Sequence, residues 1–157
     1  MICVADIARH GKRLLDAGAD ALVDRLDIAR AAEIIRGITG GRLRFGLDTV
    51  GRDTATSLQQ TLFITEANQP QSHLLGLTGI PKQRHPRITY HTVPIKIFHI
   101  SETIGGSLTT WLETLLQNSS LILPEVVRAE GGLAGINDAL ERLRDGSISG
   151  KRIVVGL

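Results

Sequence analysis

The chain has 157 residues, of which 42% are hydrophobic and 22% charged, and its formal net charge is +2. This length can bury a core, and the aliphatic content excludes a disordered or collagen-like chain. No apolar stretch approaches the roughly 18 residues of a membrane span, and the N-terminus lacks signal-peptide features. A single cysteine, Cys3, excludes an internal disulfide, so we expect a cytoplasmic protein without a membrane partner.

Basic residues gather in two clusters, at residues 9–13 and 82–87. A nucleic-acid site would need such clusters beside stacking aromatic side chains, and only 3% of the residues are aromatic. The clusters therefore indicate solvated surface or a small-anion site, and no nucleic-acid partner is expected.

Short apolar runs alternate with amphipathic stretches along the chain, which is typical of βαβ units. In chain order the pattern predicts strands at 2–5, 21–24, 43–50, 73–77, 93–98 and 151–157. Helices are expected at 7–18, 28–38, 53–62, 108–116 and 133–143. Asp27 and Asp53 are expected to cap the second and third helices, and Pro94 places its strand at a sheet edge. The fold class is α/β: a mostly parallel sheet with helices on both faces.

Several segments, taken in order, resemble the medium-chain dehydrogenase/reductase superfamily. They are "AGADALVD", "GLDTVG", "LLGLTG", "HTVPIKIFH" and "PEVVRAEGGLAGINDALERLRDGSISGKRIVV". The last two narrow the resemblance to the zinc-independent quinone oxidoreductase and trans-acting enoyl reductase (ToxD-like) branch. The resemblance covers essentially the whole chain. It implies a partial Rossmann-like domain over residues 1–100 and a helix–strand segment over residues 101–157 that packs on it.

The same resemblance implies an incomplete Rossmann-type sheet. The family's GroES-like barrel, first strand and glycine-rich phosphate loop have no counterpart in this sequence, which contains no G-x-G-x-x-G. In the Rossmann strand order the missing strand is the central one. We therefore expect its two neighbours to pair directly, or another strand to stand between them: either residues 151–155 or a strand from a second chain.

The segment that follows the first predicted strand contains three candidate cofactor-binding residues. By resemblance, it lies where members of the family bind the adenosine ribose of their cofactor. Asp6 would accept from ribose hydroxyls, while Arg9 and Lys12 would neutralise a 2′-phosphate, which favours NADP(H) over NAD(H). The alternative is that Asp6 caps a helix whose basic face is simply solvated.

Two further groups lie at the carboxyl ends of the third and fourth strands, where open α/β sheets bind ligands. They are Asp48, Thr49 and Gly51, and Gly76 with Thr78. By resemblance these positions line the cofactor's ribose and nicotinamide, largely through backbone groups. The alternative is ordinary turn chemistry, in which glycine provides special backbone angles.

Acid–base candidates flank the predicted fifth strand: Tyr90, His91, Lys96 and His99. On a strand, Lys96 would share a face with Phe98, and His99 would lie on the other. The alternative is the exposed polar face of an edge strand. The histidines lack the spacing of a metal site, and the matching branch has no catalytic zinc, so no metal is expected.

Two functions of different classes remain open. The first is an NADPH-dependent enoyl or quinone reductase acting on a small molecule in secondary metabolism, in which this chain alone is not expected to transfer hydride. The second is a cofactor-independent isomerase or cyclase, of pericyclase type. It would use the cleft left vacant by the missing cofactor and the missing barrel. A non-catalytic binding subunit is a third possibility.

The resemblance also implies a homodimer formed through the predicted edge strand Val93–Phe98.

Overall fold

The structure is a computed structural model that describes residues 1–64, 72–94 and 96–156. The chain divides into two compact units, Met1–Lys96 and Ile97–Leu157. The first contains β1 (Ile2–Ala5), α1 (Ile7–Asp16), β2 (Ala21–Asp24), α2 (Ile28–Thr39), β3 (Phe45–Asp48), α3 (Arg52–Gln59), β4 (Ser72–Gly76) and β5 (Ile88–Thr92). The second contains α4 (Ile97–Ile100), α5 (Glu102–Gln117), β6 (Glu125–Ala129), a 3₁₀ turn (Gly132–Gly135), α6 (Ile136–Arg144) and β7 (Lys151–Val155). Every strand pair is parallel, so the α/β prediction is confirmed.

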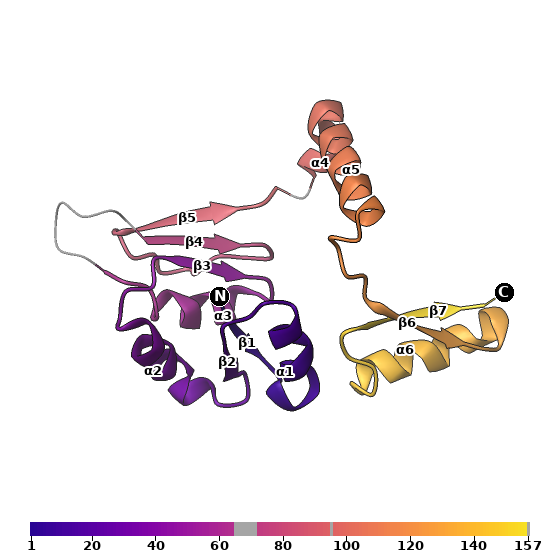
Figure 1. Cartoon of the computed structure of the whole chain (residues 1–157), viewed down its shortest axis with the longest axis horizontal. Helices are drawn as coiled ribbons and strands as arrows, with labels where there is room; N and C mark the ends of the chain where they lie inside the picture. Colours follow the sequence, from indigo (N-terminus) through magenta and orange to yellow (C-terminus); the bar gives the residue numbers. More distant parts are fainter. Residues whose placement is uncertain (65–71, 95, 157) are drawn as a thin grey trace. The chain divides into compact units, whose positions relative to one another are not determined.

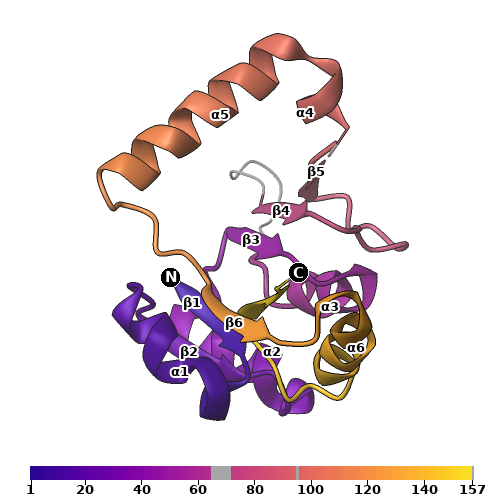
Figure 2. The ribbon, with the colours of Figure 1, turned by 90° about the vertical axis from the view of Figure 1, so that its right-hand side faces the viewer.

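The first unit holds two separate sheets (Figures 1 and 2). Strand β1 pairs with β2, and β3, β4 and β5 form a second sheet in that order. Helix α1 packs against β1 and β2 so closely that a Cβ at Gly11 would lie 3.3 Å from Leu22. Direct pairing of β1 with β3 was one expectation, and among the described residues the two strands do not pair.

Helix α3 covers one face of the three-stranded sheet and forms the main core with it. Leu74, in the central strand, is fully buried and packs with Ala55, Leu62 and Ile88. Gly46 lets the helix approach, because a Cβ there would meet the Leu58 side chain at 2.9 Å. Burial of these apolar side chains is what fixes the sheet to its helix.

Two of the predicted helix caps differ from the structure. Asp53 is not a cap: α3 begins at Arg52 after Gly51, whose N–H donates to Thr54 Oγ1 at 3.1 Å. Asp27 does stand at the N-cap of α2, but it makes no cap hydrogen bond. Its carboxylate accepts from Arg30 instead, and this hydrogen bond holds the pKa of Asp27 below its usual value.

The predicted edge strand Val93–Phe98 is wrong. The edge strand is β5, whose Ile88 and Tyr90 side chains alternate into the core beneath it. Pro94, which has no N–H to donate, follows the strand, and residues Ile97–Ile100 form helix α4. Ile95 lies outside the described residues. The strand expected to carry a homodimer is therefore not formed as predicted, and the homodimer itself stays a prediction.

In the second unit, β7 pairs with β6, so the last strand has a partner of its own. Helix α6 packs against β7, and its Ala139 is buried. Helix α5 packs against α4, and a Cβ at Gly105 would lie 2.5 Å from the Phe98 carbonyl oxygen. Among the described residues, no helix is long and apolar enough to cross a membrane.

Candidate functional site

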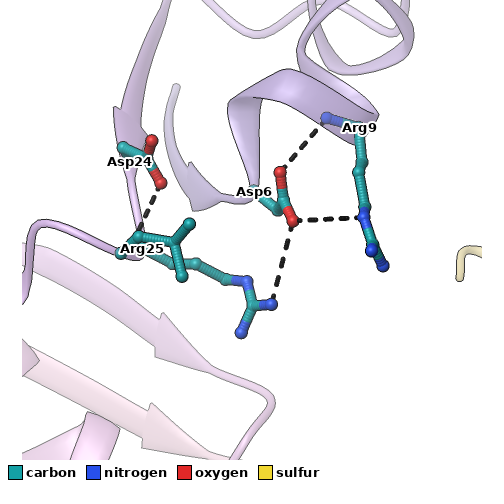
Figure 3. A network of polar contacts seen from close by, with 5 residues as sticks. Asp6, Arg9, Asp24 and Arg25 are labelled. Carbon is teal, nitrogen blue, oxygen red and sulfur yellow. Dashed lines mark hydrogen bonds and ion pairs between the residues drawn. The ribbon is translucent and has the colours of Figure 1, made fainter. Parts of the chain in front are cut away.

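Asp6, Arg9 and Arg25 meet at the carboxyl ends of β1 and β2 (Figure 3). Asp6 caps α1 by accepting from the Arg9 N–H at 3.1 Å, and its other oxygen lies 3.6 Å from Arg9 Nε and 3.8 Å from Arg25 Nη2. The Asp6 side chain is only 12% exposed, whereas both arginine side chains are more than half exposed. Two guanidinium groups thus share one carboxylate at this edge and still face solvent.

The contribution of Arg25 was not predicted from the sequence. It directly follows β2, and the register that pairs Ala5 with Asp24 places it beside Asp6. The Asp24 carboxylate accepts from Leu26 N–H at 2.9 Å and so fixes the turn that carries Arg25. The sequence did contain a signal for this contribution, namely a basic residue immediately after the second predicted strand.

Lys12 does not join this cluster in the interactions described. Its Nζ donates to Asp16 Oδ2 at 2.6 Å, one helical turn further along α1. The Lys12 side chain is almost fully exposed, so this ion pair is a surface contact. Of the three predicted residues, Asp6 and Arg9 therefore lie together, and Arg25 takes the place expected for Lys12.

The Asp48 carboxylate serves its own turn at the end of β3. It is buried, and Oδ1 accepts from Val50 N–H at 3.0 Å and from Gly51 N–H at 2.8 Å. Thr49 is exposed beside it. Asp48 therefore shapes the turn, while Thr49 is presented to solvent.

The turn after β4 lies against the turn after β3. A Cβ at Gly76 would be 2.1 Å from the Gly79 carbonyl oxygen, and one at Gly51 would be 4.0 Å from Thr78 Oγ1. Leu77 N–H also donates to the Asp48 carbonyl at 2.9 Å. The structure thus brings these five predicted residues together as one backbone-built edge.

The four acid–base candidates are not brought together in the interactions described. The Tyr90 hydroxyl lies on the α3 side of the sheet, donates to Gln59 Oε1 and accepts from His85 N–H at 2.8 Å. His91 lies on the other face, with Nε2 3.0 Å from His73 Nδ1. Lys96 ends the first unit, and His99 belongs to helix α4 of the second.

Tyr90 has a structural role in this arrangement, and this can be tested. Tyr90→Phe removes the hydroxyl that joins α3 to the loop before β5, leaving the half-buried partners unpaired. We expect the free energy of unfolding to fall by about 1–2 kcal/mol, measured by urea denaturation. Loss of a catalytic activity without loss of stability would contradict this role.

No three His, Cys, Asp or Glu side chains converge within the described ranges 1–64, 72–94 and 96–156. A cavity of about 390 Å³ lies near the amino ends of the strands, between α2, the end of α3 and the start of β5. Its walls include Arg36, Gln60, Phe63, His85 and Ile88. The carboxyl-edge residues predicted to bind a ligand do not line it.

Neither a family model nor a curated protein matches this chain. Solved structures share its fold at low sequence identity. A candidate NADPH:quinone reductase from Bacillus thuringiensis superposes with a TM-score of 0.75 at 16% identity, over 97% of this chain and 47% of that one. A mycobacterial protein solved in complex with NADPH gives 0.72 at 20% identity, over 98% and 49%.

The enoyl reductase CurK gives a TM-score of 0.70 at 13% identity, over 97% of this chain and 46% of its own. This chain therefore spans about half the length of the solved structures that it matches. At these identities the likeness establishes the fold, which is the α/β arrangement described above.

Proposed function

We propose that residues 1–157 form the nucleotide-binding half of an NADP(H)-dependent reductase acting on the activated double bond of a small enoyl or quinone substrate. The observation that carries this proposal is the cluster of Asp6, Arg9 and Arg25 at the carboxyl ends of two parallel strands. Such ends are the usual ligand-binding edge of an open α/β sheet. The fold shared with a candidate quinone reductase, with an enoyl reductase and with a mycobacterial protein solved with NADPH supports the same assignment.

The residues present fit the adenosine end of the cofactor. The Asp6 carboxylate can accept from a ribose hydroxyl, and Arg9 and Arg25 place two guanidinium groups where a 2′-phosphate would be neutralised. Both guanidinium groups already lie within 4 Å of the Asp6 carboxylate, so they are gathered at this edge of the sheet. This arrangement favours NADP(H) over NAD(H).

When bound, the cofactor supplies hydride to the substrate. The turns at Asp48–Gly51 and Gly76–Gly79 would position it with backbone groups, with the Thr49 and Thr78 hydroxyls at the same edge. The sequence provides no glycine-rich loop for the pyrophosphate, so complete turnover requires a further polypeptide segment. We place this activity in the cytoplasm and in secondary metabolism.

Calorimetric titration of the purified chain with NADPH and NADH tests the proposal. We expect NADPH to bind more tightly than NADH. The Arg25→Ala substitution should lower the affinity for NADPH by about tenfold and leave the affinity for NADH unchanged. Arg44→Ala is the matched control, because it removes one positive charge at the opposite end of the strands.

Equal loss of NADPH affinity in both variants would assign the effect to net charge rather than to this cluster. Absence of binding at millimolar cofactor would overturn nucleotide binding by this chain. The isomerase or cyclase alternative and the binding-subunit alternative would then be pursued with substrate screens that contain no cofactor.

A further inference from the structure

The cavity of about 390 Å³ near the amino ends of the strands has an apolar wall. Leu62, Phe63 and Ile88 line it, and Leu62 and Ile88 also belong to the buried core beneath the sheet. Small-molecule sites of this size combine such walls with a few polar groups that fix the orientation of the ligand. The cavity is separate from the candidate cofactor edge, because neither Asp6 nor Arg25 is among the described residues that line it.

His85, in the loop before β5, contributes a hydrogen-bond donor to the cavity wall. The Arg87 N–H donates to His85 Nδ1 at 3.2 Å, so the neutral ring carries its hydrogen on Nε2. The backbone N–H of His85 donates to the Tyr90 hydroxyl at 2.8 Å, which holds this loop against the sheet. Within the described part of the chain nothing accepts from His85 Nε2, so its N–H is available to a ligand.

Gln59, at the end of α3, contributes a second donor for the same kind of reason. Its Oε1 accepts from the Tyr90 hydroxyl, which leaves the Nε2 end of the amide. No described residue accepts from Gln59 Nε2. Tyr90 thus uses the acceptor of the amide, and what remains at the cavity wall is an N–H donor.

Arg36 adds a positive charge from a third element. It lies in the last turn of α2, and its Nη2 donates to the Gln60 carbonyl oxygen just after α3. A guanidinium has further N–H groups beyond the one used here. The lining residues that the structure describes include no Asp or Glu. Several donors, one of them cationic, without an acidic neighbour favour an anionic ligand.

The basic cluster at residues 82–87 supports the same conclusion. Its sequence indicates either solvated surface or a small-anion site. In the structure His85 lines the cavity, and the Arg84 guanidinium carbon lies 5.9 Å from the centre of the Tyr90 ring. The cluster therefore brings positive charge to the same loop that carries the His85 donor.

We propose that this cavity binds a small organic anion, namely a monocarboxylate with an apolar body. The carboxylate accepts from Arg36, Gln59 and His85, and the apolar body covers the wall formed by Phe63 and Ile88. A bare inorganic anion would leave that wall exposed to water, and a neutral compound would not pair with the guanidinium. The site goes beyond the proposed function and does not depend on it.

Sodium benzoate is the probe, and its binding to the full chain is followed by amide NMR at constant ionic strength. We expect saturable shifts of the Gln59 side-chain amide and of the His85 and Phe63 backbone amides. Benzamide has the same shape without the charge, and inorganic phosphate has charge without the apolar body. Each should bind about tenfold or more weakly than benzoate.

Two variants make the test specific to the cavity. Arg36→Gln should lower the affinity for benzoate by about tenfold. Arg30→Gln is the matched control, because Arg30 lies in the same helix and carries the same charge but does not line the cavity. Gln59→Glu keeps an oxygen that accepts from Tyr90 but replaces the donor with a carboxylate. We expect it to abolish benzoate binding in a folded chain, and urea denaturation checks the fold.

Three results would overturn the proposal. The first is the absence of saturable shifts at tens of millimolar benzoate. The second is equal affinity for benzamide or for phosphate. The third is an equal loss of affinity in Arg36→Gln and Arg30→Gln, which would assign the effect to net charge. If Gln59→Glu does not fold, the comparison of the two arginine variants decides the question. None of these measurements involves NADPH, so this proposal and the proposed function fail separately.

Discussion

Replacing Leu74 with alanine is expected to lower the free energy of unfolding by about 2–5 kcal/mol. Leu74 is 0% exposed at the centre of the three-stranded sheet, where it packs with Ala55, Leu62 and Ile88. The substitution removes buried apolar surface and leaves a cavity, and both effects destabilise the fold. Urea denaturation followed by circular dichroism measures the change.

Leu47→Ala is the matched control for this prediction. The residue type and the sheet are the same, but Leu47 lies on the face opposite α3 and is 58% exposed. We expect a change within about 0.5 kcal/mol. A loss as large as that of Leu74→Ala would mean that this face is covered in solution, contrary to the structure.

Gly76→Ala is expected to destabilise the fold by about 2–3 kcal/mol and to weaken any ligand bound at the carboxyl edge. The new Cβ would stand 2.1 Å from the Gly79 carbonyl oxygen, so the backbone of the turn must move. That movement displaces Thr78, which lies in the same turn. Denaturation and the NADPH titration described above report the two effects separately.

Gly37→Ala provides the control for the glycine substitution itself. Gly37 lies inside α2, and a Cβ there would meet no atom within 4 Å apart from its chain neighbours and the backbone of its own helix. Alanine favours helix over glycine, so we expect stabilisation by about 0.5–1 kcal/mol. A loss of stability in both variants would contradict the specific clash at Gly76.

Local patterns predicted much of the first unit. The strands at 2–5 and 21–24 coincide with β1 and β2, and the helix predicted from residue 28 begins and ends within one residue of α2. These elements are predicted correctly because the residues that set their periodicity and mark their ends lie close together in the sequence. Gly40, for example, ends α2 in the left-handed conformation that favours glycine.

The fifth strand shows why such patterns also fail. Residues 88–92 and 93–98 both alternate well enough to form a strand, so sequence periodicity alone could not separate them. The choice depends on Tyr90, whose hydroxyl reaches Gln59 across 31 positions of sequence, and on Ile88, which fills the core beneath β4. Long-range packing of this kind overrides local propensity.

By itself the sequence determined the α/β class, most helices and strands, and the two carboxyl edges that carry the candidate ligand residues. Only the tertiary structure decided which of those side chains meet. Arg25 forms an ion pair with Asp6, and Lys12 donates to Asp16. The Asp48 carboxylate accepts hydrogen bonds from the backbone of its own turn. The tertiary structure also decided that β1 and β3 stay unpaired with each other. The physical reason is the same in each case. Periodicity fixes elements through neighbours in sequence, whereas strand register and side-chain contacts depend on residues far apart in the chain.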